Sequence, residues 1–289
     1  MVSALIISMR PHQWTKNGFI FAGLVFSQNV LHGALLLKTL EAFLAFCLLT
    51  GGVYIINDVI DLKEDRVHPQ KRTRPIASGR VAKGTAFTVA ALLVIFSLFF
   101  SFVLDAGFGM TALIYFLLMV AYSLFLKRVV ILDVLAISAG FILRVVAGAV
   151  LVGVHISSWL LTCTIFLSLF LALGKRRYEL VTMDPGSGGH RQVMESYSLT
   201  FVDQLIAVAA ASTLLSYALY TMSAATVKKF GSENLRFTIP FVVYGIFRYL
   251  YLIHVRQEGD NPGKVLFSDR PLLIDVALWV VVVGLILYA

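Results

Sequence analysis

Residues 54–79 read "YIINDVIDLKEDRVHPQKRTRPIASG", and here acidic side chains follow directly on a long apolar run. That run, over residues 40–61, is long enough to cross a hydrocarbon layer of about 30 Å. Similar runs recur along the 289 residues, and only 14% of the chain is charged, against about 25% in soluble domains. The sequence therefore predicts an all-α, polytopic membrane protein with one membrane domain over residues 1–289.

The apolar runs predict about nine membrane-spanning helices, whose connections differ strongly in charge. The predicted spans cover residues 18–38, 40–61, 84–104, 108–126, 132–152, 158–174, 204–224, 238–255 and 271–288. Of the Lys and Arg residues, 18 lie on the side that holds the N-terminus and 4 on the opposite side. Because cytoplasmic loops carry an excess of Lys and Arg, we expect a multi-pass plasma-membrane protein with its N-terminus in the cytoplasm. This distribution accounts for the net charge of +8 without a nucleic-acid partner.

Three aspartates at the end of the second predicted span share a helix face. Asp58, Asp61 and Asp65 follow the spacing i, i+3, i+7, and Asn57 precedes Asp61 by four residues. An unpaired aspartate near the centre of a membrane-spanning helix is costly, and three carboxylates on one face repel each other. Carboxylate and amide oxygens are hard ligands that suit Mg²⁺, so the stripe predicts a magnesium site. An interfacial helix end whose acids pair with Lys63, Arg66 or Lys71 remains the alternative.

The string "NDVIDLKED" (residues 57–65) fits the NDxxDxxxD signature and resembles the UbiA superfamily of intramembrane prenyltransferases. The resemblance implies a nine-helix bundle whose polar pocket opens toward the cytoplasm. It also implies that Asn57, Asp58, Asp61 and Asp65 hold Mg²⁺, which grips the diphosphate of a substrate.

The chain departs from the ordinary family pattern after the sixth predicted span. Typical members carry a second aspartate-rich motif there, but this chain reads "LALGKRRYEL" (residues 171–180). Lys175, Arg176 and Arg177 replace the acids, and only Glu179 is acidic. Such a cluster would bind an anion directly, without a metal; a basic helix end that only fixes topology is the alternative reading.

Further basic and polar residues lie near the cytoplasmic ends of other spans. They are Arg10 and Lys16 before the first span, His68, Lys71, Arg72 and Arg74 after the acids, and Tyr122, Lys127, Arg128 and Asp133 at the fourth inner turn. Arg144 lies within a span, where an arginine faces the protein interior or a wet cavity. A structural pairing of Arg144 with Asp133 or a helix-end carbonyl is equally open.

Taken together, "RPHQWTKN", "NDVIDLKEDRVHPQKRTRPIASG", "LDVLAISAGFILRVVAGA" and "LALGKRRYEL" resemble one branch of the superfamily, the decaprenyl-phosphate phosphoribosyltransferases. That resemblance implies Mg²⁺-dependent transfer of 5-phosphoribosyl from phosphoribosyl diphosphate to a polyprenyl phosphate, on the pathway to lipid-linked arabinose donors for cell-wall polysaccharide. We expect Asp58, Asp61 and Lys16 to be catalytic. The expected substrate-binding residues are Arg10, Lys16, His68, Lys71, Arg72, Arg74, Tyr122, Lys127, Arg144, Lys175, Arg176, Arg177 and Glu179.

Two other function classes stay open at this point. The acidic stripe also suits a true prenyltransferase that moves an isoprenoid onto an aromatic acceptor, although the second acidic motif is missing. A transporter or lipid-binding protein would have a similar helical build, but transporters carry their broken helices near the midplane, whereas the polar residues here gather at one membrane face. Polyprenyl chain length and oligomeric state, a homo-oligomer included, are not readable from the sequence.

Overall fold

The computed structural model describes residues 1–182, 192–259 and 262–288, and all regular structure within these ranges is helical. The α-helices are α1 (Val2–Ser8), α2 (Ala22–Phe26), α3 (Gly33–Ile60), α4 (Leu62–Val67), α5 (Lys83–Leu104), α6 (Ala106–Leu124), α7 (Leu132–Val152), α8 (Ser158–Val181), α9 (Leu199–Met222), α10 (Ala224–Phe230), α11 (Ile239–His254), α12 (Pro262–Ser268) and α13 (Arg270–Tyr288). Short 3-10 segments are η1 (Pro11–Phe21), η2 (Lys71–Thr73), η3 (Leu126–Arg128), η4 (Gln192–Ser196) and η5 (Asn234–Thr238).

The contacts divide the chain into two compact units. Unit 1 comprises residues 1–136, 143–155 and 183–196, and unit 2 comprises residues 137–142, 156–182 and 197–289. Each is described by itself below. The expectation of one membrane domain over residues 1–289 stays a prediction.

Eight of the described helical stretches are long and apolar enough to cross a membrane. They confirm the all-α, polytopic class, and several predicted spans agree closely with them; the span at 132–152 coincides with α7. The predicted span at 18–38 is wrong as a single helix. The chain leaves helical geometry between α2 and α3, where Gln28 has φ 61°, and α3 already begins at Gly33. Polar residues in "SQN" (27–29) and His32 break the run, although the average hydropathy over the window hides them.

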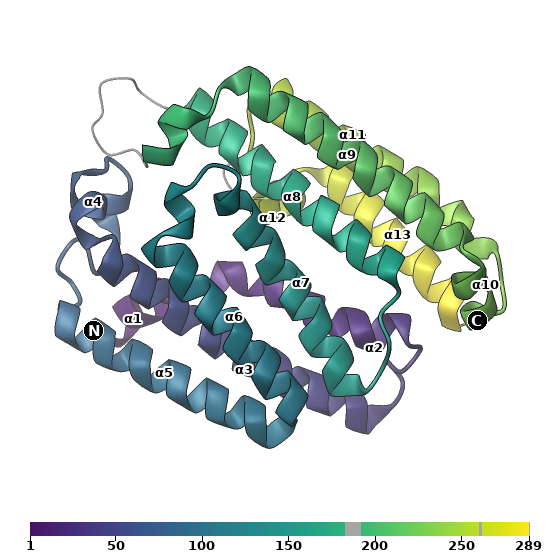
Figure 1. The fold of residues 1–289 in the computed structure, drawn as a ribbon, viewed down its shortest axis with the longest axis horizontal. Helices are drawn as coiled ribbons and strands as arrows, with labels where there is room; N and C mark the ends of the chain where they lie inside the picture. Colours follow the sequence, from purple (N-terminus) through teal and green to yellow (C-terminus); the bar gives the residue numbers. More distant parts are fainter. Residues whose placement is uncertain (183–191, 260–261, 289) are drawn as a thin grey trace. The chain divides into compact units, whose positions relative to one another are not determined.

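The segment before α3 nevertheless runs along much of that helix. Arg10 pairs with Asp58 near the end of α3, Asn17 bonds Thr50, and the ring of Phe21 lies 5.7 Å from that of Phe43. These pairs describe an antiparallel register. Because a 3-10 helix rises about 2.0 Å per residue and an α-helix 1.5 Å, η1 and α2 together extend about 30 Å. Figure 1 accordingly shows α1 and α4 near one end of α3 and α2 toward the other.

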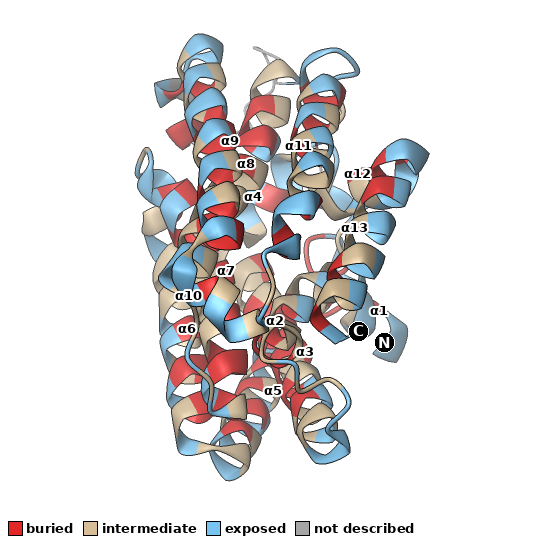
Figure 2. Ribbon diagram, turned by 90° about the vertical axis from the view of Figure 1, so that its right-hand side faces the viewer, coloured by how far each residue is buried: buried red, intermediate tan, exposed pale blue. Residues whose placement is uncertain are grey.

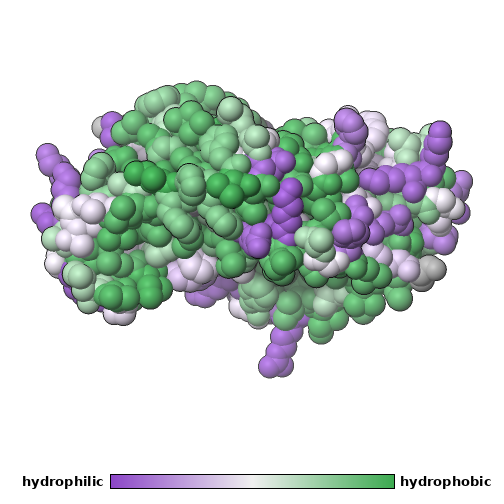
Figure 3. All heavy atoms as spheres, turned by 90° about the horizontal axis from the view of Figure 1, so that it is seen from below, coloured by the Kyte–Doolittle hydropathy of each residue, from purple (hydrophilic) through white to green (hydrophobic). Residues whose placement is uncertain are grey.

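Within unit 1, α3 is the central helix and packs against η1, α5 and α6 (Figure 1). Phe46 of α3 contacts the rings of Phe108 and Tyr115 on α6. By contrast, α5 exposes large apolar residues such as Phe96 and Phe99. Figure 3 shows one face of the molecule, where hydrophobic side chains cover broad areas and hydrophilic ones form limited patches. Such a surface suits a lipid environment.

Glycines allow the segment before α3 to approach α7 closely. A methyl group at Gly148 would lie 1.8 Å from the carbonyl oxygen of Ile20, and one at Gly23 would lie 2.8 Å from the backbone of Ala149. Small residues serve this purpose in membrane proteins, because backbones can then pack directly against each other. This contact holds η1 and α2 against α7 within unit 1.

Unit 2 is held together by α8, α9, α11 and α13. Along α9, buried positions such as Val202 and Ile206 alternate with exposed ones such as Val208, a pattern that is visible in Figure 2. Polar contacts add to this packing. The Tyr217 hydroxyl receives a hydrogen bond from Trp279 Nε1 at 2.9 Å, and Arg248 binds Asp269 through two nitrogens.

Candidate functional site

The three predicted acidic residues lie where α3 meets α4. α3 ends at Ile60, and Asp61 forms the junction between the two helices. The backbone N–H of Asp61 donates to the carbonyl of Asn57 at 2.9 Å, and that of Asp65 donates to the carbonyl of Asp61 at 2.8 Å. This helical bonding continues through the junction, so the predicted spacing on one face is retained. Asp58 and Asp65 are 2% and 3% exposed.

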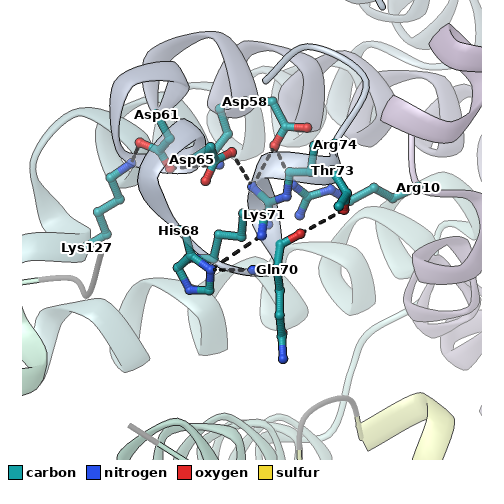
Figure 4. Close-up of polar contacts among 11 residues, drawn as sticks. Arg10, Asp58, Asp61, Asp65, His68, Gln70, Lys71, Thr73, Arg74 and Lys127 are labelled. Carbon is teal, nitrogen blue, oxygen red and sulfur yellow. Dashed lines mark hydrogen bonds and ion pairs between the residues drawn. The ribbon is translucent and has the colours of Figure 1, made fainter. Parts of the chain in front are cut away.

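Each of these carboxylates is paired with a basic side chain (Figure 4). Arg10 and Lys127 form ion pairs with Asp58 and Asp61, respectively. Arg74 Nη1 lies 2.6 Å from Asp65 and 3.1 Å from Asp58. We call these six residues the acid–base cluster; it contains three acids and three bases, all from unit 1.

The partners of the acids differ from those that the alternative reading named. It proposed Lys63, Arg66 or Lys71, whereas the ion pairs described for the acids come from Arg10, Arg74 and Lys127. Two of these three lie far away in the sequence: Arg10 is 48 residues from Asp58, and Lys127 is 66 residues from Asp61. The cluster is therefore built by tertiary structure rather than by a local helix end.

The links between helices position the three bases. Arg10 has φ 54°, directly before η1, and its guanidinium lies over the ring of Tyr54 at 4.8 Å. In the loop after α4, His68 Nδ1 accepts the backbone N–H groups of Gln70 and Lys71 at 3.2 and 3.4 Å. These bonds shape the turn that leads to Arg74. His68 thus has a structural contact, and its predicted role at the substrate stays a prediction.

The donor set of the acids fits a hard divalent cation by chemistry, since three carboxylates and the Asn57 amide are the oxygen ligands that Mg²⁺ accepts. Asn57 Nδ2 donates to Asp61 Oδ2 at 3.2 Å, which keeps the amide within the same face. Among the described residues, however, no three acidic, His or Cys side chains converge as a ready-made metal site. The charged partners of the carboxylates are the three bases.

Arg144 is buried in the middle of α7, where it contacts two residues that the sequence analysis did not single out. Its Nε donates to Asn17 Oδ1 and its Nη2 to the Tyr115 hydroxyl, both at 2.8 Å. The guanidinium also lies 4.7 Å from the centre of the Tyr115 ring. Asn17 lies just before the predicted span at 18–38, and nothing in the sequence pattern indicated this contact.

The basic string after the sixth predicted span lies on α8, in unit 2. Glu179 pairs with Arg176 and, at 3.9 Å, with Lys175. Arg177 donates to Asp203 and to the carbonyl of Ile253, both at 2.8 Å. Arg176 and Arg177 are buried and Lys175 is exposed. These contacts place the string within its own unit, and its role in binding an anion stays a prediction.

The remaining predicted residues belong to unit 1. Lys16, Lys71 and Tyr122 are partly buried, and Arg72 is exposed. Partial burial and the charges of Arg10 and Lys16 lower the pKa of His12 from its ordinary value.

Comparison with known proteins adds evidence of kinship over most of the chain. The profile of the UbiA prenyltransferase family matches residues 18–267. A decaprenyl-phosphate phosphoribosyltransferase of Mycolicibacterium smegmatis is 32% identical, covering 100% of this chain and 93% of the relative. The protein of the same name from Mycobacterium tuberculosis is 31% identical, covering 98% and 94% of the two chains. A UbiA homologue from Archaeoglobus fulgidus, solved bound to GPP and Mg²⁺, has a TM-score of 0.76 at 17% identity and covers 99% of this chain and 100% of the homologue.

Proposed function

The chain belongs to the UbiA prenyltransferase family, and from this premise we propose that it is a membrane-embedded pentosyltransferase. It transfers the 5-phosphoribosyl group of phosphoribosyl diphosphate to decaprenyl phosphate, or a similar polyprenyl phosphate, and releases diphosphate. Two relatives that carry the name of this activity, each about 30% identical over nearly the whole chain, support the proposal. The product would feed lipid-linked arabinose donors for cell-wall polysaccharide.

The acid–base cluster is the observation that carries this function. A donor with a diphosphate at C1 and a phosphate at C5 suits a site in which acids hold a metal for the diphosphate and bases bind phosphate directly. The cluster presents both kinds of residue at the end of α3. Asn57, Asp58, Asp61 and Asp65 would hold Mg²⁺. When bound, Mg²⁺ supplies Lewis-acid stabilisation of the departing diphosphate.

The basic residues of unit 1 bind and orient the anionic groups. Arg10 and Arg74 can each offer two parallel hydrogen bonds to a phosphate, and Lys127 offers a compact charge. Lys16 at the start of the chain is a further phosphate ligand, with His68, Lys71 and Arg72 in the adjoining loop. Arg144, held in place by Asn17 and Tyr115, presents a fixed cation deeper in the membrane. Tyr122 contacts ribose hydroxyls.

The reaction requires no strong general base from the chain. The attacking oxygen of a polyprenyl phosphate is already anionic near pH 7, so it displaces diphosphate from C1 through an oxocarbenium-like state. Attack from the face opposite the leaving group inverts the configuration at C1. In unit 2, Lys175, Arg176, Arg177 and Glu179 of α8 stand where the usual second acidic motif would be, and their binding of a substrate anion stays a separate prediction. The site and the N-terminus face the cytoplasm, consistent with the uneven distribution of Lys and Arg.

The test uses the purified chain in detergent with Mg²⁺, polyprenyl phosphate and phosphoribosyl diphosphate labelled in the ribose. We expect label to pass into the organic phase and this transfer to fall at least about 100-fold, or about 2.7 kcal/mol, in Asp61→Ala. Glu64→Gln, which changes an exposed acid on α4, is the matched control. Turnover of a prenyl diphosphate onto an aromatic acceptor, without ribosyl transfer, would contradict the proposal.

A further inference from the structure

The acids of the acid–base cluster already have counter-ions within the chain. Asp58, Asp61 and Asp65 face Arg10, Arg74 and Lys127 in ion pairs, so their formal charges cancel. Asp58, Asp65 and Lys127 are nearly inaccessible to solvent, and such groups are costly to leave without a partner. We infer that these three bases act as internal counter-ions, so that a divalent cation binds the cluster only together with an anionic ligand that takes over the bases. The inference rests on the proposed function for the choice of diphosphate as that anion.

Charge balance explains why neither ligand would bind well alone. A divalent cation on its own would compete with Arg74 and Lys127 for the carboxylates and would leave those bases beside an added positive charge. Diphosphate on its own would draw the bases away and leave buried carboxylates unpaired. When both bind together, the metal balances the acids and the diphosphate balances the bases. Each ligand must therefore raise the affinity for the other by the same factor.

The position of the bases in the chain makes this exchange of partners feasible. The acids lie on α3, on α4 and at their junction, whereas Arg10 precedes η1, Arg74 follows η2 and Lys127 lies in η3. All three bases thus belong to short 3-10 segments or their ends rather than to the long helices. Their side chains can turn toward a phosphate while α3 and the carboxylates stay in place.

The experiment measures binding without turnover, with Mn²⁺ as the metal and inorganic diphosphate as the anion. Mn²⁺ bound to the purified full chain is followed by electron paramagnetic resonance, and the Mn²⁺–diphosphate complex formed in protein-free buffer is subtracted. We expect diphosphate to lower the dissociation constant for Mn²⁺ at least tenfold, and Mn²⁺ to do the same for diphosphate. Equal Mn²⁺ affinity with and without diphosphate, or no binding in either case, would overturn the inference.

Removing one internal counter-ion should uncouple the two ligands. Lys127→Gln is expected to bind Mn²⁺ alone at least tenfold more tightly than the unmodified chain, with a smaller gain from diphosphate. Lys63→Gln removes the same charge from an exposed position on α4 and should behave as the unmodified chain. If Lys127→Gln gains no affinity for Mn²⁺, the bases are not counter-ions in this sense.

Two further measurements keep the test decisive if Lys127→Gln is unstable. Mn²⁺ should raise the Tm of this variant more than that of the unmodified chain, because the metal replaces the lost charge. Mn²⁺ should likewise raise the Tm of Arg10→Gln more than that of the unmodified chain, because this variant leaves Asp58 without Arg10. Coupled binding of Mn²⁺ and diphosphate without ribosyl transfer would refute the proposed function and leave the inference standing. Ribosyl transfer with uncoupled metal binding would refute the inference and leave the proposed function standing.

Discussion

Arg74 and Asp65 lie 2.6 Å apart, and the same guanidinium nitrogen is 3.1 Å from Asp58. One basic side chain from the loop thus serves a carboxylate on α3 and another on α4. The contact fastens the loop over residues 68–81 to the end of the longest helix. It also offsets the repulsion between two buried carboxylates, Asp58 and Asp65, that lie close together.

Arg74→Gln should destabilise the protein because it leaves Asp65 buried with a weaker partner. We expect a loss of about 2 kcal/mol, less than the 3–5 kcal/mol typical of fully buried pairs because Arg74 is partly exposed. The Tm in detergent measures this loss. Adding Asp65→Asn to Arg74→Gln should restore part of it, and Arg66→Gln on the exposed face of α4 should change little. Additive effects of the two substitutions would contradict the pairing.

Gly148→Ala should be among the most damaging small substitutions in unit 1. Its methyl group would lie 1.8 Å from the carbonyl oxygen of Ile20, and a backbone atom cannot move aside as a side chain does. We expect little folded protein after purification, or a loss of stability of more than about 3 kcal/mol. Gly84→Ala, at an open helical position of α5, is the control and should keep the Tm. An unchanged Tm in Gly148→Ala would show that the two backbones are further apart.

Tyr115→Phe tests the support of Arg144. The change removes the hydroxyl that accepts from Arg144 Nη2 at 2.8 Å but keeps the aromatic ring. Loss of an acceptor for a buried charged donor costs about 1–3 kcal/mol, and ribosyl transfer should fall because Arg144 is less well oriented. Tyr244→Phe on the exposed face of α11 is the matched control for both measurements. Equal stability and activity in the two variants would show that the Tyr115 hydroxyl does not support Arg144.

Asp269 should make part of the stability dependent on acid pH. The hydrogen bonds from Arg248 lower the pKa of this carboxyl below its ordinary value near 3.8. A lowered pKa in the folded state means that the contribution is fully present above that ordinary value and is lost as the pH falls through the lowered one. Above about pH 5 the Tm of the unmodified chain and that of Asp269→Asn should run in parallel, and below about pH 4 the Tm of the unmodified chain should fall more steeply. Curves that stay parallel at the lower pH as well would contradict the assignment.

Much of the fold was predictable because hydropathy and helix length decide it. α7 and α13 begin and end within a residue or so of the predicted spans. The first predicted span was wrong because the mean hydropathy over a long window stays high across residues 27–32, although polar side chains within this segment end the helix. The tight geometry of η1 was also out of reach, since its partners on α3 and α7 are distant in sequence.

The candidate site was predictable only in its local part. The spacing of Asp58, Asp61 and Asp65 places them on one face, and the structure keeps this arrangement through the α3–α4 junction. Periodicity contains no information about Arg10 or Lys127 as partners, because those pairs depend on how the helices pack. The same holds for the contact of Asn17 with Arg144.

The close approach of Ile20 to Gly148 has a consequence for how the protein is made. Ribosomes add roughly 5–20 residues per second, so roughly 6–25 s separate the appearance of these two positions. Until α7 emerges, the segment formed by η1 and α2 has α3 beside it but lacks its second neighbour. Nascent chains that stop after α6 should therefore expose this segment to membrane proteases and insertion factors, and protection should appear only once α7 has been synthesised.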